Sequence, residues 1–163
     1  HIEGIDERVE HLIKLRAQQD RSLARAANHA SGNGSAASGP APAAFQCLIP
    51  LSFIPDGSEL AHLPGPTGLD DLKTLAISRL LLDNFDHIKA FWIMQSPKLA
   101  QVTLNWGVDD FDGTVVWYDI TKREGQGTTH QELSIDQIVR LIREAGCQPR
   151  ERDSFYRPVL RPT

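Results

Sequence analysis

The chain has 163 residues, of which 40% are hydrophobic and 23% are charged, and both fractions are ordinary for a globular domain. The net charge of −4 and the scattered Lys and Arg residues exclude a basic surface for nucleic acid. The chain contains no apolar run near the roughly 20 residues that span a bilayer, and no signal-peptide pattern. We therefore expect a cytoplasmic protein without a membrane partner.

The chain begins with His1 rather than Met, which predicts a fragment or a processed product. Its two cysteines, Cys47 and Cys147, are far apart and are expected to be reduced, inert thiols, with a disulfide as the alternative. They form no CxxC pair, and the histidines lack the spacing of metal ligands. We predict no metal site in this chain.

A helix is predicted over residues 6–20, where apolar residues recur at helical spacing. Asp6 is a suitable N-cap, and the charged side chains of this helix, among them Arg8 and Arg16, are expected to face water. Residues 21–44 are rich in Ser, Gly, Ala and Pro and are predicted to be a flexible, low-complexity insertion.

Apolar, β-rich runs alternate with helical patterns over residues 45–146. Strands are predicted at 45–53, 88–94 and 108–114, and helices at 67–82, 96–107 and 134–146. The core face of the helix over 67–82 is assigned to Leu69, Leu72, Ala76, Ile77 and Leu80.

Each predicted helix has a recognisable start. Thr67 followed by Asp70 resembles a capping box, and Ser134 followed by Gln137 is a clear one. The pair Ser96-Pro97 is typical of an N-cap and the first helical position, and Gly107 and Gly146 are expected to end their helices. Residues 147–163 are expected to wrap the surface.

Alternating strands and helices predict the α/β class with a parallel sheet. Three strands cannot close a barrel, and a complete (β/α)8 barrel needs about 250 residues. If the chain is the back part of such a barrel, its first strand has an open edge that the missing half should cover.

Several motifs follow one another in an order typical of one enzyme family. They are residues 49–53 (IPLSF), 62–64 (HLP), 66–68 (PTG), 78–80 (SRL), 82–84 (LDN), 92–94 (WIM) and 109–116 (DDFDGTVV). With this series the chain resembles the C-terminal half of aminofutalosine synthase, a radical SAM enzyme of menaquinone biosynthesis. The related cyclase tends to have Trp in place of Leu51 and Gly in place of Asp112, so the synthase is preferred.

The resemblance implies a radical SAM (β/α) barrel whose N-terminal half holds a [4Fe-4S] cluster on three cysteines. The cluster reductively cleaves S-adenosylmethionine. The 5′-deoxyadenosyl radical then adds to 3-[(1-carboxyvinyl)oxy]benzoate, and rearrangement with decarboxylation gives aminofutalosine. This chain has no arranged set of thiolates. It is therefore expected to bind no cofactor alone, to be inactive alone, and to need the N-terminal half of the barrel, in the same or a separate chain.

Two departures from the family leave alternatives open. Trp117 begins a stretch that is more often Glu-Glu-Lys in the family, and Lys122 stands where His is common. The alternatives are a related radical SAM enzyme, of the cyclic dehypoxanthinyl futalosine synthase or deazaflavin synthase type, and a non-catalytic half-barrel partner subunit.

Active-site side chains of such barrels lie at the carboxyl ends of the strands. As the resemblance has it, His1 and Glu3 follow a strand that precedes this chain and lie near the cofactor or substrate. Ser52, at the tip of the first predicted strand, could bind a carboxylate or a ribose hydroxyl, or could simply satisfy the turn. His62 lies in the loop above that strand, and Gln95 ends the second one.

The third predicted strand offers two further candidates. Asp112 and Thr114 lie near its carboxyl end and are the preferred substrate-binding pair from that strand. A substrate with two carboxylates calls for cationic or N–H partners, a role for which His62 is the candidate, with simple loop packing as its alternative. The catalytic residues themselves stay unassigned.

Overall fold

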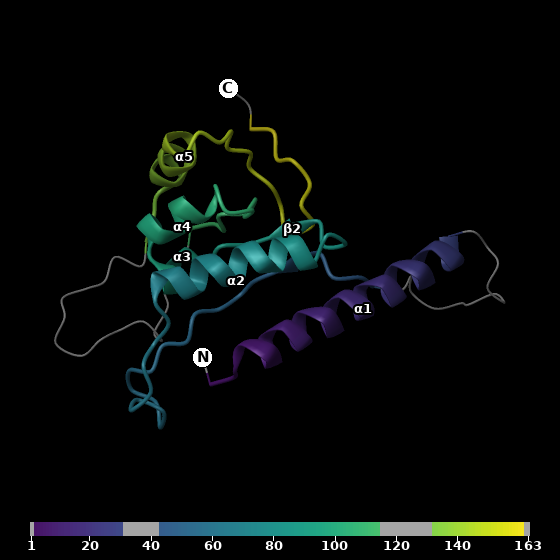
Figure 1. Ribbon diagram of the computed structural model, residues 1–163. Coiled ribbons are helices and arrows are strands. Elements are labelled where there is room, and N and C mark those ends of the chain that lie inside the picture. Colours follow the sequence, from purple (N-terminus) through teal and green to yellow (C-terminus); the bar gives the residue numbers. More distant parts are fainter. Residues whose placement is uncertain (1, 31–42, 115–131, 162–163) are drawn as a thin grey trace.

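The computed structural model describes residues 2–30, 43–114 and 132–161. In chain order its elements are α1 (Ile5–Ala30), β1 (Cys47–Leu48), α2 (Gly68–Leu81), β2 (His87–Ile88), α3 (Trp92–Gln95), α4 (Pro97–Thr103) and α5 (Ile135–Glu144). The two strands are parallel and helices lie around them (Figure 1), which agrees with the predicted α/β class. No helix in the described ranges is long and apolar enough to cross a membrane.

α1 is longer than the sequence predicts. It continues to Ala30, whereas we expected it to end at Asp20 and an insertion to begin at residue 21. Residues 21–30 are rich in Ala, Arg and Leu, which have high helix propensity, so the helix has no local reason to stop at residue 20. Residues 31–42 of the predicted insertion lie outside the described part.

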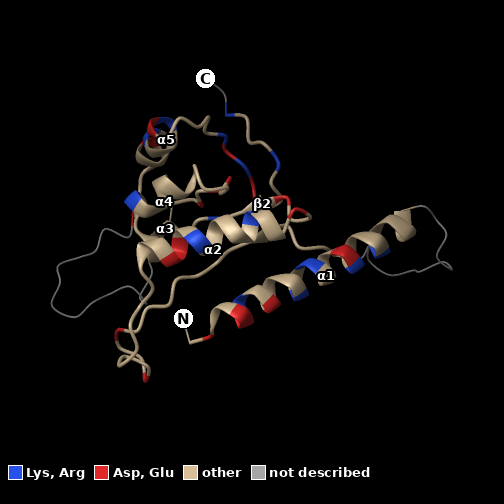
Figure 2. Cartoon of the chain, viewed as in Figure 1, with Lys and Arg blue, Asp and Glu red and all other residues tan. Residues whose placement is uncertain are grey.

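Polar contacts attach α1 to the rest of the molecule. Gln19 is 2% exposed, and its side-chain amide both accepts from the backbone N–H and donates to the carbonyl of Phe45, each at 2.8 Å. Arg16, predicted to face water, donates to the carbonyl of Leu81 at 2.6 Å and pairs with Asp83. Acidic and basic residues are both distributed along this helix (Figure 2).

The sheet is shorter than predicted. β1 pairs with β2, with Leu48 opposite Ile88, and the third predicted strand contributes one parallel bridge, between Lys89 and Asp110. Pro50 has no N–H to continue the ladder, and the other edge of β1 pairs with no strand in the described part. The predicted strand over 45–53 therefore pairs over two residues only.

The chain after β2 turns into α3 instead of continuing as a strand to residue 94. Trp92 is 1% exposed, and its indole N–H donates to the carbonyl of Gly113 at 3.0 Å. A buried Trp needs a hydrogen-bond acceptor for its indole N–H. The helical turn of α3 orients the Trp92 ring so that its N–H reaches the Gly113 carbonyl.

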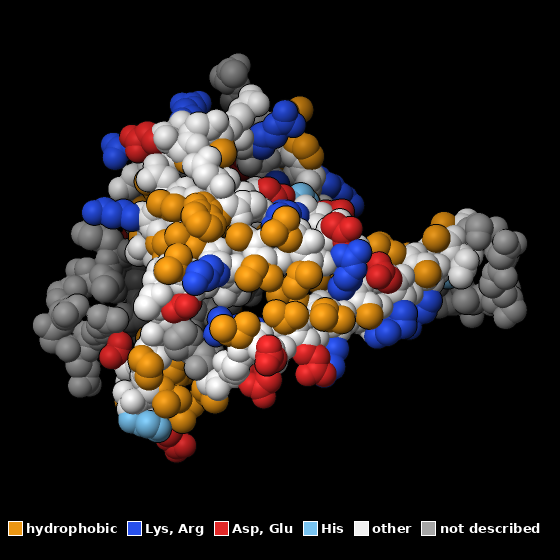
Figure 3. All heavy atoms as spheres, in the orientation of Figure 1, with side chains coloured by type: hydrophobic (Ala, Val, Ile, Leu, Met, Phe, Trp, Pro, Cys, Tyr) orange, Lys and Arg blue, Asp and Glu red, His pale blue; other side chains and the backbone are white. Residues whose placement is uncertain are grey.

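The core face assigned to α2 is wrong at three of its five residues, while Leu72 and Ala76 are half-buried. Leu69, Ile77 and Leu80 are 54%, 40% and 79% exposed. Figure 3 shows hydrophobic side chains gathered on this face of the molecule. The residues that α2 buries are Leu75 and Ser78, on the opposite side of the helix. The apolar pattern alone did not determine which side of α2 faces the sheet. Only the narrow side around Leu75 packs against the core.

The predicted starts of α2, α4 and α5 are confirmed, whereas α1 begins at Ile5, so that Asp6 lies in its first turn and is not its N-cap. Thr67 with Asp70 and Ser134 with Gln137 form complete capping boxes, in which each side chain bonds the partner's backbone N–H. Ser96 caps α4, with Pro97 in its first turn. Gly146 has a φ angle of 82° just after the end of α5, as expected for a residue that ends a helix. Gly107 has a φ angle of 95°, but α4 already ends at Thr103, so the predicted helix over 96–107 is too long and Gly107 does not end it.

One apolar core joins these elements. Its buried members are Leu75, Ile88, Ala90, Trp92, Ala100, Val108, Phe111, Leu133 and Ile138. They come from α2, β2, α3, α4, α5 and the segments between them, whereas α1 contributes none of its residues to this cluster. The core therefore lies on one side of β1, and α1 covers the other.

Candidate functional site

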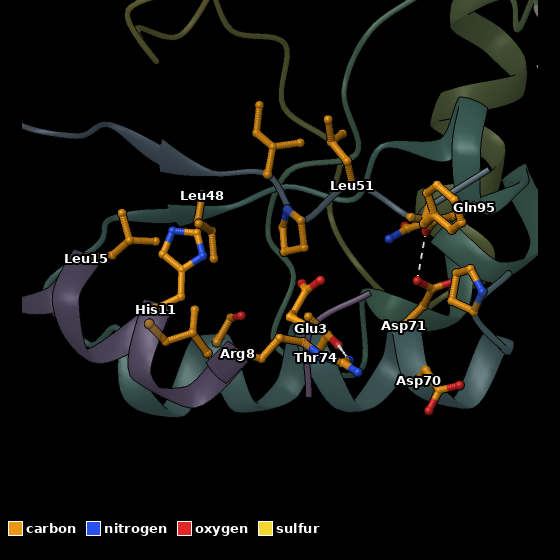
Figure 4. Close-up of a pocket in the computed structure, with 17 residues that line it drawn as sticks. Glu3, Arg8, His11, Leu15, Leu48, Leu51, Asp70, Asp71, Thr74 and Gln95 are labelled. Atoms are coloured by element: carbon orange, nitrogen blue, oxygen red, sulfur yellow. Dashed lines mark hydrogen bonds between the residues drawn. The ribbon is translucent and has the colours of Figure 1, made fainter. Parts of the chain in front are cut away.

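A pocket of about 300 Å³ lies between α1, α2 and the segment that follows β1 (Figure 4). Three of the predicted site residues, Glu3, Ser52 and Gln95, line it, although they come from three separate segments. Residues 49–53, which follow the carboxyl end of β1, form one wall. The structure thus brings together the candidates that the sequence placed after three different strands.

The other predicted site residues lie elsewhere. His62 is exposed in the loop that follows residue 55 and is not part of the pocket wall. Asp112 accepts a hydrogen bond from Nζ of Lys89 at 3.2 Å, and Thr114 is exposed near it. Neither lines the pocket. His1, Trp117 and Lys122 are outside the described residues.

Ser52 binds a carboxylate of the protein itself. It is 7% exposed, and its hydroxyl donates to Oδ1 of Asp71 at 2.8 Å. An ionised carboxylate can only accept, so the hydroxyl hydrogen of Ser52 is committed to Asp71 and only its lone pairs face a ligand. Of the two ligand groups predicted for Ser52, a hydroxyl suits this arrangement and a carboxylate does not.

Burial in the pocket wall also affects Asp71. Removal from water raises the pKa of the Asp71 carboxyl above its ordinary value, although the hydrogen bond from Ser52 opposes this. A charged carboxylate at this position is poorly solvated, and a ligand that donates hydrogen bonds to it would relieve that cost.

One face of α2 forms a polar floor to the pocket. Asp71, Thr74 and Ser78 follow one another at intervals of three and four residues, which places them on the same side of a helix, and all three line the cavity. Arg8 of α1 reaches this floor, where its NH1 group donates to Oγ1 of Thr74 at 3.4 Å. Arg8, predicted to face water, is half-buried instead.

Two buried acceptors in the wall lack partners. Gln95 is 6% exposed and Ser78 is fully buried, and within the described residues neither Oε1 of Gln95 nor Oγ of Ser78 has a hydrogen-bond partner. Nε of Arg8 is likewise buried and unpartnered there. A buried polar atom without a partner costs about 1–3 kcal/mol. Several such atoms around one cavity are typical of a site that a ligand completes.

The ionisable groups of the wall are mainly acidic. Carboxylates of Glu3, Asp70 and Asp71 line the pocket, and Arg8 is the one Lys or Arg residue among the described lining. Asp70 is occupied in the capping box of α2, where it accepts from the backbone and hydroxyl of Thr67. The potential in the pocket therefore favours a cationic or hydrogen-bond-donating ligand.

A second polar cluster holds the C-terminal segment. Asp110 is 8% exposed and accepts from the hydroxyl of Tyr156 and from NH2 of Arg152, each at 2.5 Å. Burial alone would raise the pKa of Asp110, but these bonds, together with the charge of Lys89, lower it. The Tyr156 ring stacks on His87, with centroids 3.7 Å apart. Every charge here has a protein partner, so the cluster is structural.

Six polar residues of the pocket lining were not among the predicted site residues: Arg8, His11, Asp70, Asp71, Thr74 and Ser78. The spacing of Asp71, Thr74 and Ser78 is visible in the sequence as a polar face of α2. The predicted core face of this helix lay on its more apolar side, so the polar face had no predicted role. Arg8 carried no signal at all, because a charged residue on an amphipathic helix normally faces water.

The described residues offer no metal site. No group of three or more His, Cys, Asp or Glu side chains in them is arranged to hold a metal ion. Cys47 and Cys147 are both free, and burial raises the pKa of the Cys47 thiol, which disfavours the thiolate that a metal would need.

Comparison with known proteins places the chain in a family. Residues 42–163 match the family model described as the CofH/MqnC C-terminal region. The chain is 42% identical over 163 residues to aminodeoxyfutalosine synthase of Thermus thermophilus, a match that covers 98% of this chain and 38% of that protein. It is 35% identical over 166 residues to aminodeoxyfutalosine synthase of Streptomyces coelicolor, covering 96% and 38%.

A relative with another activity is nearly as similar. The 5-amino-6-(D-ribitylamino)uracil–L-tyrosine 4-hydroxyphenyl transferase of Methanothermobacter thermautotrophicus is 33% identical over 165 residues, covering 98% of this chain and 39% of that protein. The chain thus spans about two fifths of the length of these curated relatives. From the family model and the aminodeoxyfutalosine synthases that match along nearly its full length, the chain belongs to the CofH/MqnC C-terminal family.

Proposed function

We propose that this chain is the C-terminal, substrate-side part of an aminofutalosine synthase. The observation that carries the proposal is the pocket at the carboxyl end of β1. There, Glu3, Ser52 and Gln95, chosen from the sequence as ligand-binding residues, line one cavity. The 42% identity to a curated aminodeoxyfutalosine synthase over nearly the full chain supports it.

The proposed reaction adds the 5′-deoxyadenosyl radical to 3-[(1-carboxyvinyl)oxy]benzoate. In a radical SAM enzyme, the [4Fe-4S] cluster and S-adenosylmethionine supply that reactivity. The residues of this chain do not fit the cluster, because it requires three arranged thiolates and the chain has two distant cysteines. The contribution of this chain is to bind and orient a reactant in a pocket sheltered from water by α1 and α2.

The partner in this proposal is the N-terminal half of a radical SAM (β/α) barrel. One edge of β1 pairs with no strand of the described part, and next to it Ile49 and Leu51 are 42% and 59% exposed. An open edge with apolar side chains is what a further parallel strand covers in a barrel. Support for such a region comes from the relatives, of whose length the chain matches 38%.

The alternative is a related radical SAM enzyme of the same barrel type. The observation that favours it is the 33% identity to a relative named as a 4-hydroxyphenyl transferase. The two readings differ in substrate rather than in fold. A non-catalytic half-barrel partner subunit is the remaining alternative. The activity assay described below distinguishes it from an enzyme.

The experiment compares the chain expressed with and without the upstream region that its gene encodes. Both proteins are reconstituted with iron and sulfide under anaerobic conditions and assayed for aminofutalosine from S-adenosylmethionine and 3-[(1-carboxyvinyl)oxy]benzoate. We expect product only when the upstream region is present. Cleavage of S-adenosylmethionine without aminofutalosine would point to a different substrate, and no cleavage by the longer protein would refute an enzymatic role.

A further inference from the structure

The face of the sheet that looks away from the core is polar. Leu48, Ile88 and Phe111 pack in or against the apolar core. Successive residues of an extended chain point to opposite faces, so their neighbours lie on the other face. Among these neighbours are Cys47, His87, Lys89, Asp110 and Asp112. In the proposed barrel the helices form the outer layer, and this polar face lines the interior of the barrel.

The C-terminal segment covers the polar face. Residues 151–159 form a hairpin with one antiparallel bridge, here called the C-terminal hairpin. The ring of Tyr156 stacks on His87 with centroids 3.7 Å apart, and its hydroxyl donates to Oδ2 of Asp110 at 2.5 Å. Arg152 donates to the same oxygen, also at 2.5 Å. The hairpin is therefore joined to the sheet by side chains that meet at one buried carboxylate.

Asp110 also holds the turn at the carboxyl end of the third predicted strand. Its Oδ1 accepts from the backbone N–H of Asp112 at 2.9 Å, while its Oδ2 accepts from Tyr156 and Arg152. Nζ of Lys89 donates to Oδ1 of Asp112 at 3.2 Å and adds a second tie to this turn. One carboxylate thus connects the C-terminal hairpin to the turn.

Two backbone positions in this series of contacts are strained. Asp112 and Tyr156 have φ angles of 64° and 60°, in the left-handed region, where a bulky residue such as Tyr is an outlier. Both residues are bonded to Asp110. Such strain persists only where the surroundings fix it, and it concentrates at functional sites. The substrate-binding pair predicted from the sequence, Asp112 and Thr114, belongs to this strained turn.

We propose that the C-terminal hairpin positions the substrate-binding turn at residues 112–114. Tyr156 and Arg152 are positioning residues that fix the turn through Asp110. His87 is the first residue of β2, so the hairpin docks at the amino ends of the strands, whereas reactants of such barrels bind at the carboxyl ends. The inference rests on the proposed function for the role of the turn in substrate binding.

Trp92 reports the position of the turn. Its indole N–H donates to the carbonyl of Gly113 at 3.0 Å, and the residue is 1% exposed. In the complete protein, as its gene encodes it and with isotope-labelled tryptophan, this N–H gives an NMR signal that Trp92→Phe assigns by its loss. The chemical shift depends on the bond to Gly113, and it is measured without any reactant.

Two variants cut the connection at the hairpin. Tyr156→Phe removes the hydroxyl and keeps the ring, and Arg152→Gln removes the guanidinium. Each should move the indole signal, and Arg152→Lys, which keeps a cation, should move it less than Arg152→Gln. The matched control Arg161→Gln breaks an exposed ion pair with Glu151 in the same segment and should leave the signal in place.

The kinetic constants of the reconstituted complete enzyme separate positioning from a purely structural role. Tyr156→Phe should raise the KM for 3-[(1-carboxyvinyl)oxy]benzoate about threefold to tenfold and leave the KM for S-adenosylmethionine unchanged, because it loosens one turn. A residue that only stabilises the fold would lower the Tm and change both KM values alike or neither. Arg161→Gln should leave both KM values unchanged.

The inference is overturned if the indole signal keeps its wild-type position in both Tyr156→Phe and Arg152→Gln. It is also overturned if Tyr156→Phe, in an active enzyme, changes the two KM values alike or changes neither. Failure of the proposed function looks different, because the wild-type protein would then make no aminofutalosine while the indole signal would still move in both hairpin variants.

Discussion

Asp71 is half-buried and Asp110 is buried, and their surroundings shift the pKa values of the two carboxyl groups in opposite directions. Asp71 has one hydroxyl as its partner, and its pKa is raised by burial. Burial also acts to raise the pKa of Asp110. Hydrogen bonds from Tyr156 and the Asp112 backbone N–H, together with nearby cations, outweigh this effect and lower the pKa. A carboxylate whose charge the protein does not satisfy is typical of a binding site, and a satisfied one of a structural network.

Replacement of Asp71 should therefore change stability in a pH-dependent way. The folded state raises the pKa of Asp71 above its ordinary value of 3.8, so its charge opposes folding at neutral pH, and this cost disappears as the pH falls through the folded pKa. Asp71→Asn should be at least as stable as wild type at pH 7.5, with a difference that shrinks towards pH 4. Denaturant unfolding at several pH values measures it, and a difference that grows on acidification would contradict the expectation.

Tyr156→Phe should destabilise the protein at neutral pH by about 1–2 kcal/mol, because it removes a hydrogen bond to a charged acceptor. The folded state lowers the pKa of Asp110, so the stability that its charge contributes is present above pH 3.8 and is lost as the pH falls through the folded value. The gap between wild type and variant should therefore close at acidic pH.

Tyr156→Leu provides the comparison for this prediction. It removes the hydroxyl bond and also the ring that stacks on His87, so it should cost more than Tyr156→Phe. Denaturant unfolding of both variants at pH 7 and in acid gives the numbers. Equal stability of wild type and Tyr156→Phe at pH 7 would show that the bond to Asp110 contributes nothing.

At the scale of elements, caps and turns follow the sequence closely, whereas strands do not. The capping boxes at Thr67 and Ser134 form as predicted because they depend on residues three positions apart. The strands depend on partners elsewhere in the chain, and β1 pairs over two residues where nine were expected (45–53). Local signals therefore locate helix starts, while strand length depends on contacts that no local pattern contains.

The turn after α4 shows how a glycine and a distant side chain depend on each other. Gly107 has a φ of 95°, and a Cβ there would lie 2.8 Å from Cγ of Arg79. Arg79 cannot easily move, because it donates to the carbonyls of Gly107 and Phe85 and pairs with Asp109. Its role is the structural one of tying α2 to this turn.

Gly107→Ala should accordingly destabilise the protein more than Gly146→Ala. Both positions have positive φ, so both variants incur backbone strain of about 1 kcal/mol, but a Cβ at Gly146 meets nothing within 4 Å. Gly107→Ala should cost about 1–2 kcal/mol beyond this, because it also disturbs Arg79. Unfolding in denaturant compares the two variants, and equal losses would mean that Arg79 moves aside freely.

At the scale of the molecule, apolar surface remains exposed around the open edge of β1. Ile49 and Leu51 are 42% and 59% exposed, although both belong to a run that reads as a buried strand. In the proposed barrel, the N-terminal half covers them. An exposed apolar edge strand is otherwise a site of aggregation.

Leu51→Lys should therefore destabilise the complete protein, by about 2–3 kcal/mol, if the barrel half covers this side chain. Leu160→Lys, at a site 92% exposed on the C-terminal segment, is the matched control and should stay within about 0.5 kcal/mol of wild type. Thermal or denaturant unfolding of the complete protein measures both. If Leu51→Lys is as mild as the control, this edge stays open and the proposed barrel is wrong.

The sequence by itself determined where α2, α4 and α5 begin, that the strands are parallel in an α/β arrangement, and which family the chain resembles. It also selected Ser52 and Gln95 from their places after predicted strands, and Glu3 from the family resemblance. The structure lines one pocket with all three, although Gln95 ends α3 and not a strand. These features depend on near neighbours or on the order of motifs along the chain.

Only the tertiary structure decided which side of α2 faces inward, and so which residues form the pocket. Apolar Leu69, Ile77 and Leu80 predicted one orientation, but packing of Leu75 against the core and the ties from Arg79 produce the opposite one. That rotation places Asp71, Thr74 and Ser78 in the pocket. A helix with two plausible faces is oriented by the surface it packs against, which no pattern within its own residues specifies.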